Sequence, residues 1–312
     1  MGAVPGWSGL LSIDKPSGVT SHDVVARVRT RLASPGAGHL GTLDPGASGL
    51  VLCALGPCTR AAQVWQGGEK TYQGTLELGV VTDTQDMSGR VLSRHPAQVT
   101  ESALRAAAAR FVGDIQQVPP MVSALRREGR RLYELARAGI EVERAPRPVL
   151  VHALELEHIE WPRVRFTVRC STGTYVRTLA HDLGGAVGCG AALVSLRRLR
   201  SEPFGLERAL PGDRLEPMTA GDVLARGGYT LPEALAHLPT LDLDAAQSVE
   251  VGLGAAARVE PGALPLSSGP LSVVLRGSDG WVAGLGELVP DGEGARARPH
   301  LVFPWAVREG RT

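Results

Sequence analysis

The sequence predicts an α+β protein with a small all-β barrel at its C-terminal end. Three observations support this class. The 312 residues suffice for one large or two ordinary domains. Helical and strand patterns are mixed without the regular alternation of strand and helix that a doubly wound sheet requires. From about Leu241 onward, short strand patterns are separated by glycine turns, which is typical of a barrel of about 60 to 70 residues.

The first helix is expected after Ser21, a good N-cap residue, and before Pro35-Gly36, which would stop it. Its apolar positions have helical spacing: Val24, Val25, Val28 and Leu32. The next segment with a clear pattern, "TYQGTLELGVV", alternates as a strand with Tyr72 near its start.

A second alternating strand is predicted for "RVRFTVRC". One of its faces carries Val164, Phe166, Val168 and Cys170, and the other carries Arg165, Thr167 and Arg169. The chain then runs through "STGTYVRTLAHDLGG", which predicts a turn at Gly173 and a short helix ended by Gly184-Gly185.

Residues 123–148 form a charged, helix-like stretch with seven arginines against four glutamates. It is either a solvated surface helix or a mobile basic arm. Residues 202–240 are rich in acidic residues, proline and glycine, and are predicted to be a connector with short helices. The strands of the barrel are expected in "LSVVLRG", "GWVAGLGEL" and "RARPHLVF".

Composition points to a soluble, unexported protein. The apolar share is 43%, but no run approaches the roughly 18 apolar residues of a membrane span, and no secretory signal pattern opens the chain. The four cysteines form neither a CxxC pair nor a zinc-binding spacing with histidine. We therefore expect reduced thiols in the core and a cytoplasmic location.

Charge is distributed unevenly along the chain although its net value is only +1. Between Glu202 and Glu293 there are 14 acidic residues and five arginines, so this segment carries −9 and the rest carries +10. Clustered positive charge favours a phosphate-bearing partner such as RNA. Only two of the basic residues, Lys15 and Lys70, are lysines.

The segment "GHLGTLDPGASGL" surrounds one carboxylate, Asp44, with glycines, a proline and a histidine. An Asx turn would explain part of this pattern. The overlapping "GAGHLG" matches the dinucleotide fingerprint, but a helix precedes it and none follows, so the match fails. No Walker sequence or nucleophile elbow occurs, and a glycosidase would need a second carboxylate. The single carboxylate, the neighbouring histidine, the glycines that permit close backbone approach and the basic clusters elsewhere together suggest chemistry on a nucleotide.

Six segments occur in the order and approximate spacing of the TruB-type tRNA pseudouridine-55 synthases, and the chain resembles this family from Gly9 to Ser201. They are "GLLSIDKPSGVTSHDVV", "GHLGTLDPGASGLVLCALGPCTR", "KTYQGTLELGVVTDTQDMSG", "VPPMVSALRREGRRLYELARAGI", "CSTGTYVRTLAHDLG" and "LRRLRS". The C-terminal part resembles a PUA RNA-binding barrel more loosely, through "GWVAGLGEL" and "RPHLVF".

The resemblance implies a catalytic domain over residues 1–240, with a mixed, mostly antiparallel sheet and a mobile thumb at 123–148. A PUA-like domain would follow over 241–312. The implied activity is that of an isomerase, an intramolecular transferase that turns uridine 55 of the TΨC loop into pseudouridine after flipping the base. It implies no cofactor and no metal, a monomer, and tRNA as partner through the elbow and, by way of Arg296, Arg298 and the tail, the acceptor stem.

The resemblance also assigns the site. Asp44 would be the catalytic carboxylate, paired with Arg177, and Tyr72 would stack on the uracil or take the C5 proton. Further residues would bind the substrate: Tyr175 and Leu199 at the base, His39 in the vacated stack, Asp86 in substrate accommodation, Lys15 in the floor of the site, and Arg197, Arg198 and Arg200 at phosphates.

Three other functions remain open at this point. The chain could be a relative of the guide-RNA-dependent enzymes that modify ribosomal RNA, although it lacks their extensions and basic tails. It could be a non-catalytic tRNA-folding chaperone, although Asp44, Tyr72 and Arg177 are all present. A glycosidase or nucleotide hydrolase is disfavoured by the single carboxylate.

Overall fold

The computed structural model describes residues 7–34, 36–123, 125–127, 129–260, 262, 264, 269–292 and 294–306. Its first half contains β1 (Gly9–Lys15), α1 (Ser21–Leu32), β2 (Ala37–His39), β3 (Ser48–Leu55), η1 (Gly56–Ala61), α2 (Gln63–Gln66), β4 (Lys70–Leu78), β5 (Val80–Thr82), β6 (Val91–Arg94), α3 (Glu101–Ala109), β7 (Gly113–Gln117), β8 (Arg126–Arg127), β9 (Arg130–Arg131) and α4 (Leu132–Arg137).

The second half contains β10 (Arg147–Glu160), β11 (Arg163–Cys170), α5 (Val176–Ala186), β12 (Ala191–Ser201), β13 (Leu210–Pro211), α6 (Ala220–Gly227), β14 (Gly228–Thr230), α7 (Leu231–Leu235), β15 (Thr240–Asp242), α8 (Ala245–Gly252), β16 (Ala257–Val259), β17 (Leu271–Arg276), β18 (Val282–Asp291) and β19 (Gly294–Val302).

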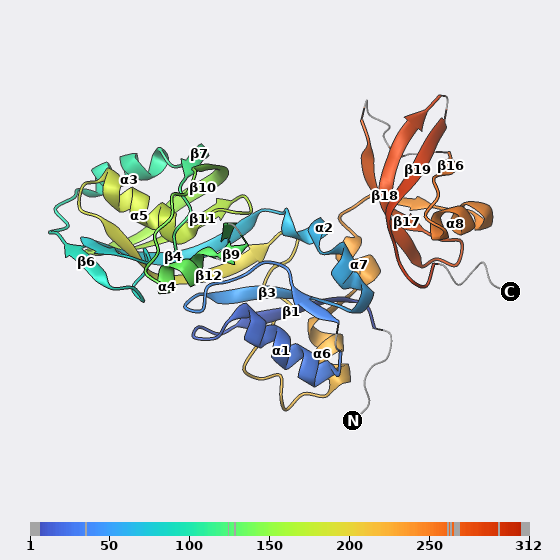
Figure 1. The fold of residues 1–312 in the computed structure, drawn as a ribbon, viewed down its shortest axis with the longest axis horizontal. Coiled ribbons are helices and arrows are strands. Elements are labelled where there is room, and N and C mark those ends of the chain that lie inside the picture. The colour runs from blue at the N-terminus through green and yellow to red at the C-terminus, as the bar shows by residue number, and fades with distance from the viewer. Residues whose placement is uncertain are drawn as a thin grey trace.

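A ten-stranded sheet forms the body of the molecule, in the order β13-β1-β3-β12-β4-β11-β10-β7, with β14 on β1 and β2 on β3. Its pairings are antiparallel except for β1 with β13 and β3 with β12. Helices α3 and α5 lie near one end of this sheet and α1 and α6 near the other (Figure 1). The α+β class and the mixed, mostly antiparallel sheet predicted from the sequence are confirmed.

The C-terminal strands form a separate five-stranded sheet in the order β15-β17-β18-β19-β16, with α8 beside it (Figure 1). This sheet fits the predicted PUA-like domain. An apolar cluster joins it to the main body, because Val274, Leu285 and Phe303 pack in one cluster with Leu10 and Trp65. The acidic connector also contributes strands β13 and β14 to the main sheet.

The alternating patterns of two strands are confirmed. In β4 buried and half-buried residues alternate along the whole strand, and the predicted apolar face of β11 is buried. All four cysteines are buried and unpaired, and burial raises the pKa of Cys53 and Cys58 to about 12 and that of Cys170 to about 11.

The ends of two predicted helices differ from expectation. Thr20, not Ser21, caps α1, because its hydroxyl accepts from the amide of Asp23 while Asp23 accepts from the amide of Thr20. Helix α5 continues through Gly184 and Gly185 to Ala186. Gly184 serves close packing instead of termination, since a Cβ there would overlap the backbone nitrogen of Ala191.

Two further expectations need correction. The stretch 123–148 is not one helix: it holds the short hairpin β8–β9 and the six-residue helix α4 before β10 begins. Ala124 and Glu128 lie outside the described residues. The helix expected to precede the glycine-rich segment is not its direct neighbour, because strand β2 lies between α1 and Asp44 and pairs with β3.

Gly49 fixes how β3 lies against β12, and we expect its replacement to destabilise the fold. Its φ is +103°, and a Cβ would overlap the carbonyl oxygen of Arg198. Gly49→Ala should therefore lower the free energy of unfolding by about 3 kcal/mol. Urea unfolding measures this, with Gly46→Ala as the control, since no atom lies within 4 Å of a Cβ at Gly46. Equal midpoints for the two variants would contradict the close approach.

Candidate active site

The loop that carries Asp44 is anchored to three neighbouring segments. The Ser21 hydroxyl, in the first turn of α1, accepts from the amide of Leu43 at 2.9 Å and donates to its carbonyl at 3.3 Å. The Lys15 ammonium donates to the carbonyl of Pro45 at 3.3 Å, and Ser17 donates to Gly46 at 2.8 Å. These contacts restrain the glycine-rich loop on both sides of Asp44.

Arg177, in the first turn of α5, brings two carboxylates together. Its Nη2 lies 3.3 Å from Oδ2 of Asp44 and its Nη1 lies 3.7 Å from Oδ2 of Asp86. The Arg177 side chain is 4% exposed, whereas that of Asp44 is 45% exposed, so a buried cation is paired with a carboxylate that remains accessible. The predicted pairing of Asp44 with Arg177 is confirmed. Nη2 of Arg177 also donates to the carbonyl of Val122 at 2.6 Å, which ties the base of the arm to the site.

Burial and charge act in opposite directions on Asp44. Desolvation raises the pKa of its carboxyl group above the ordinary value, and the nearby Asp86 adds to the rise. The charges of Arg177 and Lys15 oppose it. Arg177 therefore favours the ionised form of a carboxylate that its surroundings would otherwise tend to protonate.

Asp44 and Tyr72 line a common cavity of about 320 Å³, here called the reaction pocket. Its walls also include Gly41, Thr42, Leu43, Lys70, Ser123, Leu125, Thr172, Gly173, Thr174, Tyr175, Val176, Arg177, Leu196 and Arg198. Tyr72 is buried, and this burial raises the pKa of its hydroxyl above the usual range. A neutral phenol beside an ionised carboxylate can both stack on a planar ring and exchange a proton.

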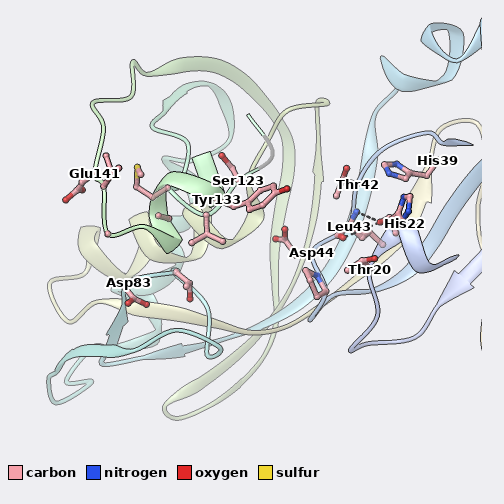
Figure 2. A pocket seen from close by; sticks show the side chains of 18 residues that line it. Thr20, His22, His39, Thr42, Leu43, Asp44, Asp83, Ser123, Tyr133 and Glu141 are labelled. Carbon is pink, nitrogen blue, oxygen red and sulfur yellow. Dashed lines mark hydrogen bonds between the residues drawn. The ribbon is translucent and has the colours of Figure 1, made fainter. Parts of the chain in front are cut away.

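A second and larger cavity of about 720 Å³, the outer cleft, adjoins the reaction pocket through Asp44. Figure 2 shows Asp44 between Ser123 and Tyr133 on one side and Thr20, His22 and His39 on the other. His39 ends β2 and is half-buried. Burial lowers its pKa, and the charges of Arg198 and His22 lower it further, so the ring is held neutral.

Tyr175 caps α5 and lies beside Arg177, whose Cζ is 5.9 Å from the centre of the Tyr175 ring. Gln117, at the end of β7, holds the backbone of Tyr175 on both sides. Its Oε1 accepts from the Tyr175 amide at 2.8 Å and its Nε2 donates to the Tyr175 carbonyl at 3.1 Å. The first turn of α5 is thereby fixed before Arg177 reaches the carboxylates.

Lys15 holds the Asp44 loop and Asp86 lies beside Arg177, whereas their roles in the floor of the site and in substrate accommodation stay predictions. Lys15 is fully buried, donates also to the Pro16 and Val19 carbonyls, and has a pKa lowered to about 8, chiefly by desolvation. Asp86 accepts from Thr84 and Ser88, and its remaining oxygen faces Arg177.

Two expected substrate contacts are wrong. Arg198 does not project toward an external phosphate, because the residue is 1% exposed and its guanidinium is directed inward. Leu199 is not in the reaction pocket; Leu196 is. The pairing of β12 with β4 explains why Leu196 lines the pocket and Leu199 does not. The register shifts between Arg198 and Arg200, so Leu199 has no partner in the regular ladder.

The two other arginines of this strand have internal partners. Arg197 forms a bidentate pair with Asp14, at 3.0 and 2.6 Å, and Arg200 pairs with Glu202 and Glu207. Their side chains remain 39% and 38% exposed. A phosphate contact from either one stays a prediction, and it would compete with these carboxylates.

Sequence reasoning missed four residues that shape the site: Ser21, Lys70, Gln117 and Leu196. For two of them a signal existed. Lys70 lies two positions before Tyr72 on the same face of a strand, and Leu196 lies two positions before Arg198. The clamps by Ser21 and Gln117 join segments far apart in the chain and left no local pattern.

Within the part of the chain that the structure describes, no three histidine, cysteine, aspartate or glutamate side chains are grouped so as to hold a metal ion. In the same part, no helix is both long and apolar enough to cross a membrane.

Comparison with solved structures first defines the class of fold. The chain resembles the crystal structure of an archaeal box H/ACA sRNP Nop10-Cbf5 complex with a TM-score of 0.70 and 26% identity, over 96% of this chain and 88% of that one. It resembles a Cbf5-Nop10-Gar1 complex with a TM-score of 0.70 and 26% identity, over 97% of this chain and 92% of that one.

The sequence comparisons then define the family. The model of the TruB family pseudouridylate synthase N-terminal domain matches residues 29–176, and that of the tRNA pseudouridylate synthase B C-terminal domain matches residues 177–222. The tRNA pseudouridine synthase B of Aromatoleum aromaticum is 45% identical over 96% of this chain and 94% of its own length. That of Geobacter sulfurreducens is 47% identical, over 79% and 81%. The chain belongs to the TruB family of pseudouridine synthases.

Proposed function

We propose that this protein isomerises uridine 55 in the TΨC loop of tRNA to pseudouridine. The observation that carries the proposal is the placement of Asp44, ionised by Arg177, and Tyr72 in one reaction pocket. The relatives named tRNA pseudouridine synthase B, 45% and 47% identical to this chain, support tRNA as the substrate.

The reaction breaks the bond between N1 of uracil and C1′ of the ribose and forms a bond between C5 and C1′. N1, which carries no proton in uridine, gains one, C5 loses one, and no electrons are gained or lost overall. The demands on the protein are therefore to hold the detached base, to stabilise the sugar and to move a proton.

Asp44 is assigned to stabilise the sugar, by one of two routes. It attacks C1′ as a nucleophile, or it acts as a base at the sugar while a glycal intermediate forms. Both routes require the carboxylate form, and a desolvated aspartate keeps that form only beside a cation. Arg177 supplies that cation, and its own side chain is buried.

Tyr72, Tyr175 and Leu196 surround the space next to Asp44 and are suited to hold a flipped uracil between aromatic and apolar surfaces. Tyr72, as a neutral phenol, is assigned to relay the proton that leaves C5: its oxygen takes up that proton while its own hydroxyl proton passes on, so the side chain stays neutral. His39, a neutral ring at the outer cleft, is assigned to the stack that the flipped base vacates.

The remaining parts bind the RNA around the flipped base. We assign residues 123–148 to a thumb that closes on the tRNA elbow, because Tyr133 and Ile140 already line the outer cleft opposite Asp44. Residues 1–240 would form the catalytic domain and 241–312 an RNA-binding domain, with Arg296 and Arg298 near the acceptor stem. The tail after residue 306 lies outside the described residues.

Tritium release tests the activity. The full-length protein is mixed with a tRNA transcript labelled with tritium at C5 of uridine, with EDTA present and no nucleotide added. We expect one equivalent of tritium to appear in water for each tRNA modified, while uracil stays attached to the RNA. Free uracil in the product would favour a hydrolase, and tRNA binding without tritium release would favour the chaperone.

A further inference from the structure

Arg198 is a fully buried arginine that the proposed chemistry leaves without a role. The residue is 1% exposed, and its guanidinium donates to two backbone carbonyls, from Nε to Leu50 at 2.7 Å and from Nη2 to Gly41 at 3.2 Å. Removing a guanidinium from water costs free energy that two neutral acceptors do not fully offset. A buried charge with such a cost is a candidate for function.

The two carbonyls flank Asp44 on the chain. Gly41 precedes it in the loop, and Leu50 follows it in β3, so one planar side chain spans the base of the loop. Lys15 and Ser21 hold the middle of the same loop at Pro45 and Leu43, but neither reaches its two ends.

The backbone of Arg198 joins the two strands that carry the site. In the main sheet Arg198 lies opposite Gly49 of β3 on one side and opposite Tyr72 of β4 on the other. Residues paired directly across an antiparallel ladder share a face of the sheet, and both side chains line the reaction pocket, where Arg198 acts to lower the pKa of the Tyr72 hydroxyl against the larger effect of burial. Arg198 therefore ties down the Asp44 loop and lies beside the Tyr72 side chain.

We propose that Arg198 is a positioning residue that fixes the Asp44 loop and the Tyr72 hydroxyl relative to each other during the reaction. The inference rests on the proposed function, because it assigns a role within the same reaction pocket. This role replaces the phosphate contact that the sequence predicted for Arg198. Arg198 would then affect the rate of the chemical step and not the affinity for tRNA.

A lysine at this position would preserve the charge but not the geometry. Its single ammonium group cannot place donors at the Leu50 and Gly41 carbonyls in the fixed arrangement of the planar guanidinium. Arg198→Lys thus separates the positioning role from a simple requirement for positive charge.

The test compares Arg198→Lys and Arg198→Gln with the parent in single-turnover pseudouridine formation on an unmodified tRNA transcript, alongside tRNA binding and thermal unfolding. We expect both variants to lose about 10²-fold in rate, with tRNA affinity close to that of the parent. Arg163→Gln is the control, because Arg163 pairs with Glu77 on the exposed part of β11 and its side chain is 62% exposed.

A double-mutant cycle distinguishes positioning from general destabilisation. In a Tyr72→Phe background the hydroxyl is absent, so Arg198→Gln should cost a smaller factor in rate than it does in the parent. If the rate loss of the double variant equalled the product of the losses of Arg198→Gln and Tyr72→Phe, the two residues would act independently and the proposal would be overturned. Should Arg198→Gln fail to fold, Arg198→Lys takes its place in the cycle.

The outcomes separate this inference from the function on which it rests. A parent that forms no pseudouridine overturns the proposed function. An active parent with an equally active Arg198→Lys variant overturns the positioning role alone. Loss of tRNA affinity with an unchanged single-turnover rate would return Arg198 to substrate binding.

Discussion

Replacing Asp44 with asparagine is expected to abolish pseudouridine formation while tRNA still binds. The amide retains the shape of the side chain but can neither attack C1′ nor remove a proton from the sugar. Loss of a group that acts directly on the reacting atoms costs about 10⁴-fold or more in rate. Tritium release over long incubations, together with filter binding of tRNA, measures the two effects separately.

The matched control is Asp114→Asn, which makes the same chemical change on an exposed residue of β7. It should leave both the rate and the affinity unchanged. An Asp44→Asn protein with a rate within about tenfold of the parent would contradict the assignment, because truncating a reacting group costs far more than that.

Replacing Arg177 with glutamine is expected to lower the rate and to move the acid limb of the pH profile to higher pH. Burial raises the pKa of Asp44, and the charge of Arg177 is the main influence that lowers it. Activity needs the carboxylate, so it falls as the pH drops through that pKa, and without Arg177 the fall begins at a higher pH. The loss on the plateau should be about 10²- to 10³-fold, typical of removing a group that stabilises charge.

Single-turnover rates between pH 5 and 9 check this expectation. Arg105→Gln, on the surface of α3 in an i,i+4 pair with Glu101, is the control and should leave the profile unchanged. A variant that lost rate equally at every pH would show that Arg177 orients Asp44 without affecting its ionisation. A variant with both the rate and the pH profile of the parent would contradict both roles of Arg177, the orientation of Asp44 and the lowering of its pKa.

The sequence predicted those parts of the molecule whose signals are local. Alternation in β4 and β11 marked buried faces, and the composition after residue 202 marked a different region of the chain. The pairing of Asp44 with Arg177, separated by 133 positions, came only from the family resemblance, since no local pattern joins two such distant side chains.

What the sequence could not predict depends on how the strands pair. The irregular register of β12 decides that Leu196 and Arg198 face the reaction pocket and Leu199 does not. Gln117 clamps Tyr175 across 58 positions, and this contact exists only once β7 and α5 are in place. Helix α4 is short for a similar reason: the charged stretch around it forms a hairpin instead of continuing the helix.

The measurement that tests the central claim most directly is the mapping of pseudouridine in an unmodified tRNA transcript after reaction with the protein. We expect one modified position, residue 55, formed by the parent and not by Asp44→Asn, and no modification in a transcript that carries cytidine at position 55. Pseudouridine at another position, or formation by the Asp44→Asn protein, would contradict the account.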